Sequence, residues 1–141
     1  MRMIKEKIDI SRSGLTQEAW QFIHDWQWDI DELRKYQTQG LKIISPSIIK
    51  NLSKFKPKEG IMLYRFFTSL DGEKQSMKNK LMSFSSSLKD TMSVIEDGGA
   101  SFMHIVYAEP SEILVDTSLM PNYERLDFVL EVIAINNGKL K

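Results

Sequence analysis

The spacing of the apolar residues changes near residue 60, and this change is the strongest constraint on the fold. In the earlier part of the chain, apolar side chains recur every three or four positions, at Ile23, Trp26, Ile30 and Leu33. This period is that of one face of an α-helix. We therefore expect residues 1–57 to be mainly helical.

Residues that favour helix ends support this interpretation. Thr16 stands where an N-cap is expected, and Asp29 followed by Glu32 has the spacing of a capping box. Gly40 marks the end of the first helical region, and Ser45-Pro46 has the serine and proline that typically begin a helix. The second helix is expected to bury Ile48, Ile49, Leu52 and Phe55. The three tryptophans, Trp20, Trp26 and Trp28, are explained mostly by packing, with a stacking platform as the alternative.

Short apolar runs replace the helical spacing after Gly60. They predict strands at residues 61–67, 81–84, 102–108, 113–115 and 127–135. Residues 68–80 are expected to be a polar loop, residues 88–97 a helix closed by Gly98-Gly99, and Asn137-Gly138 a hairpin turn into a short strand at residues 139–141. Helices first and strands later favour an α+β fold with an antiparallel or mixed sheet. We expect one domain over residues 1–141, with residues 58–141 as its β-rich core.

The composition excludes several classes of protein. The 141 residues are 42% hydrophobic and 27% charged, as in a globular protein, and 19 basic residues balance 19 acidic ones. Zero net charge argues against binding of nucleic acid or membrane by bulk charge. Without cysteine, disulfides and thiolate metal sites are excluded, and with two histidines no metal is expected. No apolar run is long enough to span a bilayer and the first residues lack a signal-like stretch, so we expect a cytoplasmic protein.

Charge is distributed unevenly along the chain. Residues 41–90 hold 10 basic and 4 acidic groups, a balance of +6, whereas residues 91–141 hold 3 basic and 8 acidic groups, a balance of −5. The basic segment is either a solvated surface or a surface that attracts an anionic ligand.

Two strands carry a charge where their alternation predicts an apolar side chain. Arg65 shares a face with Ile61, Leu63 and Phe67, and Glu131 lies in the middle of the expected strand at residues 127–135. An isolated buried charge costs several kcal/mol, so each must meet water, a partner or a ligand. Either the two pair with each other or lie at strand ends, or they serve a ligand site.

Four serines cluster at the end of the second strand, at Ser83, Ser85, Ser86 and Ser87. A cap for the helix that begins near Leu88 explains one or two of them but not all four.

These three features together resemble the mono-ADP-ribosyltransferases of the arginine–serine–glutamate class, which occur among bacterial exotoxins and phage-encoded enzymes. The matching pieces are Leu63-Tyr64-Arg65, then Phe84-Ser85-Ser86-Ser87-Leu88, then Leu130-Glu131-Val132-Ile133. Helices before the first motif and after the serines also agree, and the resemblance covers residues 15–141. It implies a split, bent, mostly antiparallel β core with NAD+ in its cleft as co-substrate.

The resemblance also implies roles for individual residues. Arg65 would bind a phosphate or ribose of NAD+, since a guanidinium offers a fixed fork to oxyanions. Ser85 would hydrogen-bond near the nicotinamide ribose and help to hold the glutamate. Glu131 would stabilise the cationic ribose as nicotinamide leaves. The remaining nucleotide-binding residues would be Tyr64, Phe84, Ser86 and Ser87. The expected partner is a macromolecular acceptor, most simply a protein, with a nucleic acid as the alternative.

Two positions depart from the family pattern. Phe66 follows the arginine, where the family commonly has glycine, and Val129 stands where the family carries an acidic or amide residue two positions before the glutamate. Glu124 and Asp127, on the preceding turn, are the candidates to contact the acceptor instead. The alternatives are another acceptor, hydrolysis of NAD+ alone, or a catalytically silent protein-binding domain. His104 is expected to be an ordinary sheet residue and His24 a surface residue.

Overall fold

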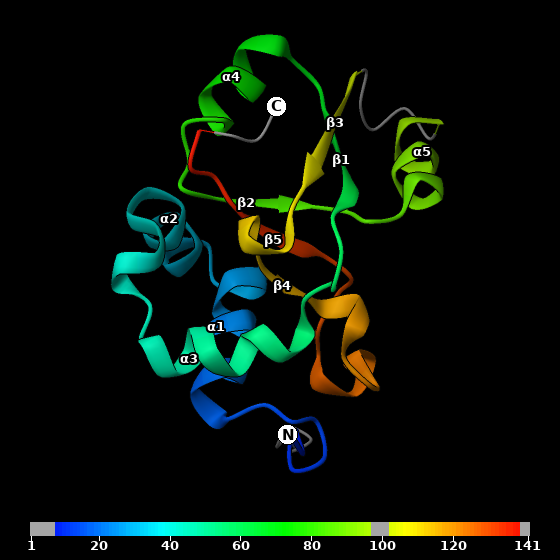
Figure 1. Ribbon diagram of the computed structural model, residues 1–141. Coiled ribbons are helices and arrows are strands. Elements are labelled where there is room, and N and C mark those ends of the chain that lie inside the picture. Colours follow the sequence, from blue (N-terminus) through cyan, green and yellow to red (C-terminus); the bar gives the residue numbers. More distant parts are fainter. Residues whose placement is uncertain (1–7, 97–101, 139–141) are drawn as a thin grey trace, which may run out of the picture.

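The computed structural model describes residues 8–96 and 102–138, which form a mixed α+β fold (Figure 1). Five α-helices occur in these residues: α1 Gln17–Trp28, α2 Ile30–Gln39, α3 Pro46–Leu52, α4 Leu70–Ser76 and α5 Leu88–Glu96. The strands are β1 Ile61–Phe67, β2 Leu81–Phe84, β3 Phe102–Ala108, β4 Ile113–Asp116 and β5 Val132–Ile135. The α+β prediction is confirmed.

The predicted positions of the helix ends in the first half of the chain are confirmed, but the capping box expected at Asp29 and Glu32 does not form, because Asp29 N donates to Asp25 O, and the Ser45 side chain makes no cap hydrogen bond. The Thr16 side chain accepts a hydrogen bond from Ala19 N at 3.2 Å, and the Asp29 side chain accepts from the first turn of α2. Gly40 closes α2 with a φ of 68°, a conformation that glycine adopts without strain. The expected apolar stripe is interrupted, because α1 ends at Trp28 and leaves Ile30, the first residue of α2, 58% exposed.

Two small antiparallel sheets meet at a single point. Strands β1 and β3 form one sheet, and β2, β5 and β4, in that order, form the other. The sheets are joined by Tyr64 of β1 and Ser85, just after β2, which exchange two backbone hydrogen bonds of 2.8 Å.

The three-stranded sheet has an apolar core on each face. One core lies between this sheet and the helices α1 and α3, and includes Ile23, Trp26, Leu52 and Ile133. The other lies between it and the β1–β3 pair, and includes Leu63, Met82, Val106 and Val132. Figure 1 shows this order, with the first three helices on one side of the sheet and β1 and β3 on the other. Since side chains alternate along a strand, Ser83 falls on the face toward α1. The hydrogen bond from Trp26 of α1 brings the carboxylate of Glu131 to the same side.

The prediction of a loop over residues 68–80 is wrong, because this segment contains the helix α4. Its N-cap is Ser69, whose hydroxyl accepts a hydrogen bond from Gly72 N at 2.9 Å. The helix is short and mostly polar, so apolar periodicity could not reveal it. Its one buried residue is Glu73.

The prediction of a strand over residues 127–135 is correct only for its second half. Asp127 has a φ of 65°, which is left-handed and incompatible with a strand, and β5 begins at Val132. Alternation over the predicted strand would place Asp127, Val129 and Glu131 on one face, and this arrangement is not found. Val129 is 49% exposed, and Glu131 lies immediately before the strand rather than inside it.

Some predicted features lie outside the described residues, namely the Gly98-Gly99 helix end and the returning strand at residues 139–141. Gly138, at the turn before that strand, has a φ of 85°. None of the helices in the described residues has the length and apolar character needed to cross a membrane.

Candidate functional site

A cavity of about 430 Å³ opens where the two sheets meet. It brings together residues from three distant parts of the sequence: Tyr64, Arg65, Phe66, Ser83, Phe84, Ser85, Val129, Leu130 and Glu131. Its volume falls within the range of small-molecule pockets. Arg65, Ser85 and Glu131, the predicted catalytic residues, all line it, as do Tyr64 and Phe84.

The guanidinium of Arg65 is anchored from β1 by two contacts. Its Nε donates to Glu73 Oε1 at 2.9 Å, and its Nη1 donates to the Ser83 carbonyl at 3.0 Å. The alternative that Arg65 pairs with Glu131 is therefore wrong. A guanidinium has five N–H groups, so three of those of Arg65 are not engaged by the described residues.

Glu73 is the buried counter-charge of this arginine. It is 7% exposed, and its second oxygen lies 3.2 Å from Nδ1 of His104 on β3. His104 faces Arg65 directly across the β1–β3 pair. The predicted ordinary sheet histidine is thus a member of a three-residue polar cluster beside the cavity.

Among the described residues, the groups that donate hydrogen bonds to the carboxylate of Glu131 are all neutral. Trp26 Nε1 donates to Oε2 at 2.9 Å, Gln27 Nε2 donates to Oε1 at 2.8 Å, and the Ser83 hydroxyl also donates to Oε2. Within the described part of the chain Glu131 makes no ion pair. The carboxylate is held in place while its charge remains uncompensated by a cation.

The serines divide into two groups. Ser83, which was not among the predicted site residues, contacts Glu131, whereas the Ser85 hydroxyl donates to the Ser87 carbonyl at 3.3 Å. Ser87 caps α5 by accepting from Asp90 N at 3.2 Å, and Ser86 is exposed. The contact to the glutamate that was expected from Ser85 is therefore made by Ser83.

The rim of the cavity is apolar. Phe66 is 42% exposed, and Val129 and Leu130 are exposed on the segment before β5. The two predicted acceptor-contacting residues lie outside the cavity lining. Oδ2 of Asp127 lies 3.3 Å from Nε2 of His24, a contact that the sequence did not predict. This histidine is half-buried and stacks on Trp20. Glu124 is exposed on the turn before it.

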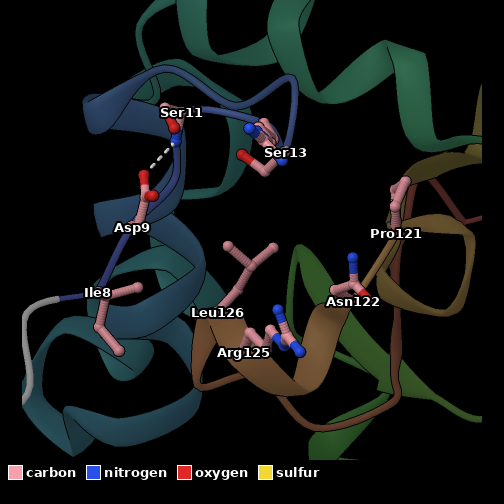
Figure 2. Close-up of a pocket in the computed structure, with 9 residues that line it drawn as sticks. Ile8, Asp9, Ser11, Ser13, Pro121, Asn122, Arg125 and Leu126 are labelled. Atoms are coloured by element: carbon pink, nitrogen blue, oxygen red, sulfur yellow. Dashed lines mark hydrogen bonds between the residues drawn. The ribbon is translucent and has the colours of Figure 1, made fainter.

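A larger cavity, of about 720 Å³, lies between the N-terminal segment and the turn before Phe128 (Figure 2). Figure 2 shows Asp9 and Ser11 on one side of it and Asn122, Arg125 and Leu126 on another. None of its lining residues lines the cavity of Glu131. Its arginines, Arg12 and Arg125, are exposed, so water screens their charges, and the smaller cavity is the stronger candidate site.

The sequence analysis does not predict four residues that contact Arg65 or Glu131, namely Trp26, Gln27, Glu73 and Ser83. The first two lie on a helix remote in sequence, and Glu73 lies in the segment expected to be a loop. Ser83 was noticed in the serine cluster, and its spacing of two residues from Ser85 was the available signal. In the described residues no three histidine or acidic side chains gather as a metal site would require.

The lining gives the cavity a defined chemical character. A cationic fork with free donors and a carboxylate held by neutral donors suit a ligand that carries both an anionic group and a centre of positive charge. Comparisons with known protein families, with curated proteins and with solved structures find no match for this chain.

Proposed function

We propose that the protein is a mono-ADP-ribosyltransferase, which cleaves NAD+ and transfers ADP-ribose to a macromolecular acceptor. The observation that carries the proposal is the shared cavity of Arg65, Ser85 and Glu131, three residues that are far apart in the sequence. They correspond in order to the arginine–serine–glutamate pattern. The core of two sheets joined at one point is compatible with the bent, split core of that class.

In the proposed reaction, the bond between ribose C1′ and the nicotinamide nitrogen breaks, and its electron pair leaves with nicotinamide. A nucleophilic atom of the acceptor then bonds to C1′ and loses its proton. Positive charge develops on the ribose between these events. A fixed carboxylate stabilises such a charge because it requires no reorganisation at the moment of reaction.

The residues of the cavity take complementary parts. Arg65 binds a phosphate of NAD+ with the N–H groups that Glu73 and Ser83 leave free. Glu131 faces the ribose and stabilises its oxocarbenium character, and Ser83 holds Glu131. Tyr64 and Phe84 line the cavity, and the exposed Phe66, Val129 and Leu130 form an apolar rim. This rim favours a protein acceptor over a nucleic acid, since nucleic-acid sites are rich in Lys and Arg.

The direct test is incubation with NAD+ labelled in its adenylate half, together with a cell lysate, while released nicotinamide is measured. We expect label on a macromolecule and stoichiometric nicotinamide. Glu131→Gln should lower turnover about 100-fold or more while NAD+ binding is kept, because the amide preserves the shape but not the charge. Glu18→Gln, at an exposed position of α1, is the matched control. If folded protein yields no label on a macromolecule and no nicotinamide, the proposal is rejected.

The apolar rim also supports a second candidate, a domain of the same fold that binds a partner protein without catalysis. Calorimetric titration with NAD+ separates the two. The silent domain would be favoured if NAD+ binds without turnover and the binding is lost in Arg65→Ala. The control is Arg34→Ala, on the exposed face of α2, which should keep the binding. Nicotinamide release without transferred label would identify an NAD+ hydrolase instead.

A further inference from the structure

The segment that carries Glu131 is not held as a strand. Residues 126–130 include the left-handed Asp127 and precede β5, so they do not take part in the sheet ladder. Their position must therefore be fixed by other contacts.

Side chains of α1 supply several of these contacts. The indole N–H groups of Trp20 and Trp28 donate to the carbonyls of Leu126 and Asp127, each at 2.9 Å. The amide of Gln27 both accepts from Val129 N and donates to Val129 O, each at 3.0 Å. One helix thus reaches the segment at three successive points.

The same helix continues to the carboxylate itself. Trp26 donates to one oxygen of Glu131 and Gln27 to the other, so both oxygens are fixed from α1. The two amide protons of Gln27 are used, one on Val129 and one on Glu131, which leaves none for a substrate. Trp26 is buried in the helical core, so its indole is itself held rigidly.

We infer that Trp26 and Gln27 are positioning residues that orient the Glu131 carboxylate toward the cavity. The inference deepens the proposed function and rests on it for its catalytic consequence. Neutral donors are suited to this task because they orient the carboxylate and leave its negative charge in place. A lysine or arginine in the same position would neutralise that charge.

The contact is tested first without any assay of activity. In protein labelled with ¹⁵N-tryptophan, the three indole N–H signals are assigned from Trp20→Phe, Trp26→Phe and Trp28→Phe. Glu131→Gln replaces a charged acceptor with a weaker neutral one. We expect it to move the Trp26 signal upfield and to leave the Trp20 and Trp28 signals in place. An unmoved Trp26 signal would overturn the inference even if the enzyme proved active.

The catalytic consequence is tested with Gln27→Ala and with Gln21→Ala, a control on the same helix whose exposed amide contacts only Asp25. We expect Gln27→Ala to lower kcat for nicotinamide release about tenfold with KM for NAD+ within about twofold, because a misplaced group weakens the transition state more than binding. It should also speed hydrogen exchange at Val129 N. Gln21→Ala should change none of these.

The outcomes separate the inference from the proposed function. The proposed function is rejected if the wild-type protein shows no turnover. The contact is still retained if Glu131→Gln moves the Trp26 signal and Gln27→Ala speeds hydrogen exchange at Val129 N. Normal kcat in Gln27→Ala, or an equal loss in Gln21→Ala, overturns the positioning role. Trp26→Phe is a second variant, which removes the indole donor and also places a smaller apolar side chain in the buried core.

Discussion

Arg65 is paired with Glu73 and not with Glu131, with 2.9 Å between Nε of the arginine and Oε1 of the glutamate. Both side chains are largely withdrawn from solvent, and the same carboxylate lies against His104. The cation and the anion that line the cavity are therefore not paired with each other. Among the described residues they share one partner, Ser83, which accepts from Arg65 through its carbonyl and donates to Glu131 through its hydroxyl. Each remains able to act on a ligand.

This pairing predicts that Glu73→Gln weakens both stability and NAD+ binding. The amide keeps the size but leaves the partly buried guanidinium without its counter-charge, at a cost of about 1–3 kcal/mol. Urea unfolding measures the stability and calorimetry measures the affinity. The control is Glu112→Gln, at a half-buried position outside the cavity lining. Unchanged NAD+ affinity in Glu73→Gln would show that Glu73 does not orient Arg65 for a ligand.

Removal of single hydroxyls distinguishes the two serines of the cavity. Ser83 donates to Glu131, whereas Ser85 donates within its own turn. We expect Ser83→Ala to lower kcat for nicotinamide release by roughly 10-fold, and Ser85→Ala to have the smaller effect on kcat. Steady-state kinetics of both variants at saturating NAD+ provide the measurement. A larger kcat effect in Ser85→Ala would assign the glutamate contact in the working enzyme to Ser85.

The sequence was informative where local rules decide the structure. The caps at Thr16 and Asp29 and the strands β1 and β3 follow from residue type and periodicity, and their ends were predicted closely. Charges at unexpected positions also pointed to Arg65 and Glu131, which line one cavity. Such residues stand out because an isolated buried charge is costly, so its presence implies a partner or a function.

The sequence was uninformative where a long-range contact overrides a local pattern. The apolar residues 128–130 predict a strand, but the side chain of Gln27, more than a hundred positions away, replaces the strand contacts of Val129. The partner of Arg65 was missed for a related reason. Glu73 lies in a short polar helix whose pattern does not distinguish it from a loop.

The hydroxyl of Thr117 is expected to stabilise the segment that carries Glu131. Thr117 is fully buried, and its Oγ1 accepts from Glu131 N and donates to Val129 O, both at 2.8 Å. Thr117→Val keeps the shape but leaves Glu131 N without this acceptor and removes one of two donors to Val129 O, so we expect a loss of about 1–3 kcal/mol in the free energy of unfolding. Thr117→Ser keeps the hydroxyl and should retain more of the stability. Equal urea midpoints for Thr117→Val and wild type would contradict this role.

Replacement of Gly40 is expected to lower the stability for two reasons, the backbone conformation of this residue and its close packing against Lys80. Its φ of 68° disfavours any side chain, and a Cβ there would lie 2.8 Å from Cβ of Lys80, whose N–H donates to the Gln37 carbonyl at 2.7 Å. Gly40→Ala should therefore lower the free energy of unfolding by about 2–4 kcal/mol, from left-handed strain and overpacking together. Gly138 has a similar φ of 85° but nothing within 4 Å of the added Cβ, so Gly138→Ala isolates the backbone part, about 1 kcal/mol. Urea unfolding of both variants separates the two causes, and equal losses would show that the approach of Lys80 to Gly40 contributes nothing to the junction between α2 and β2.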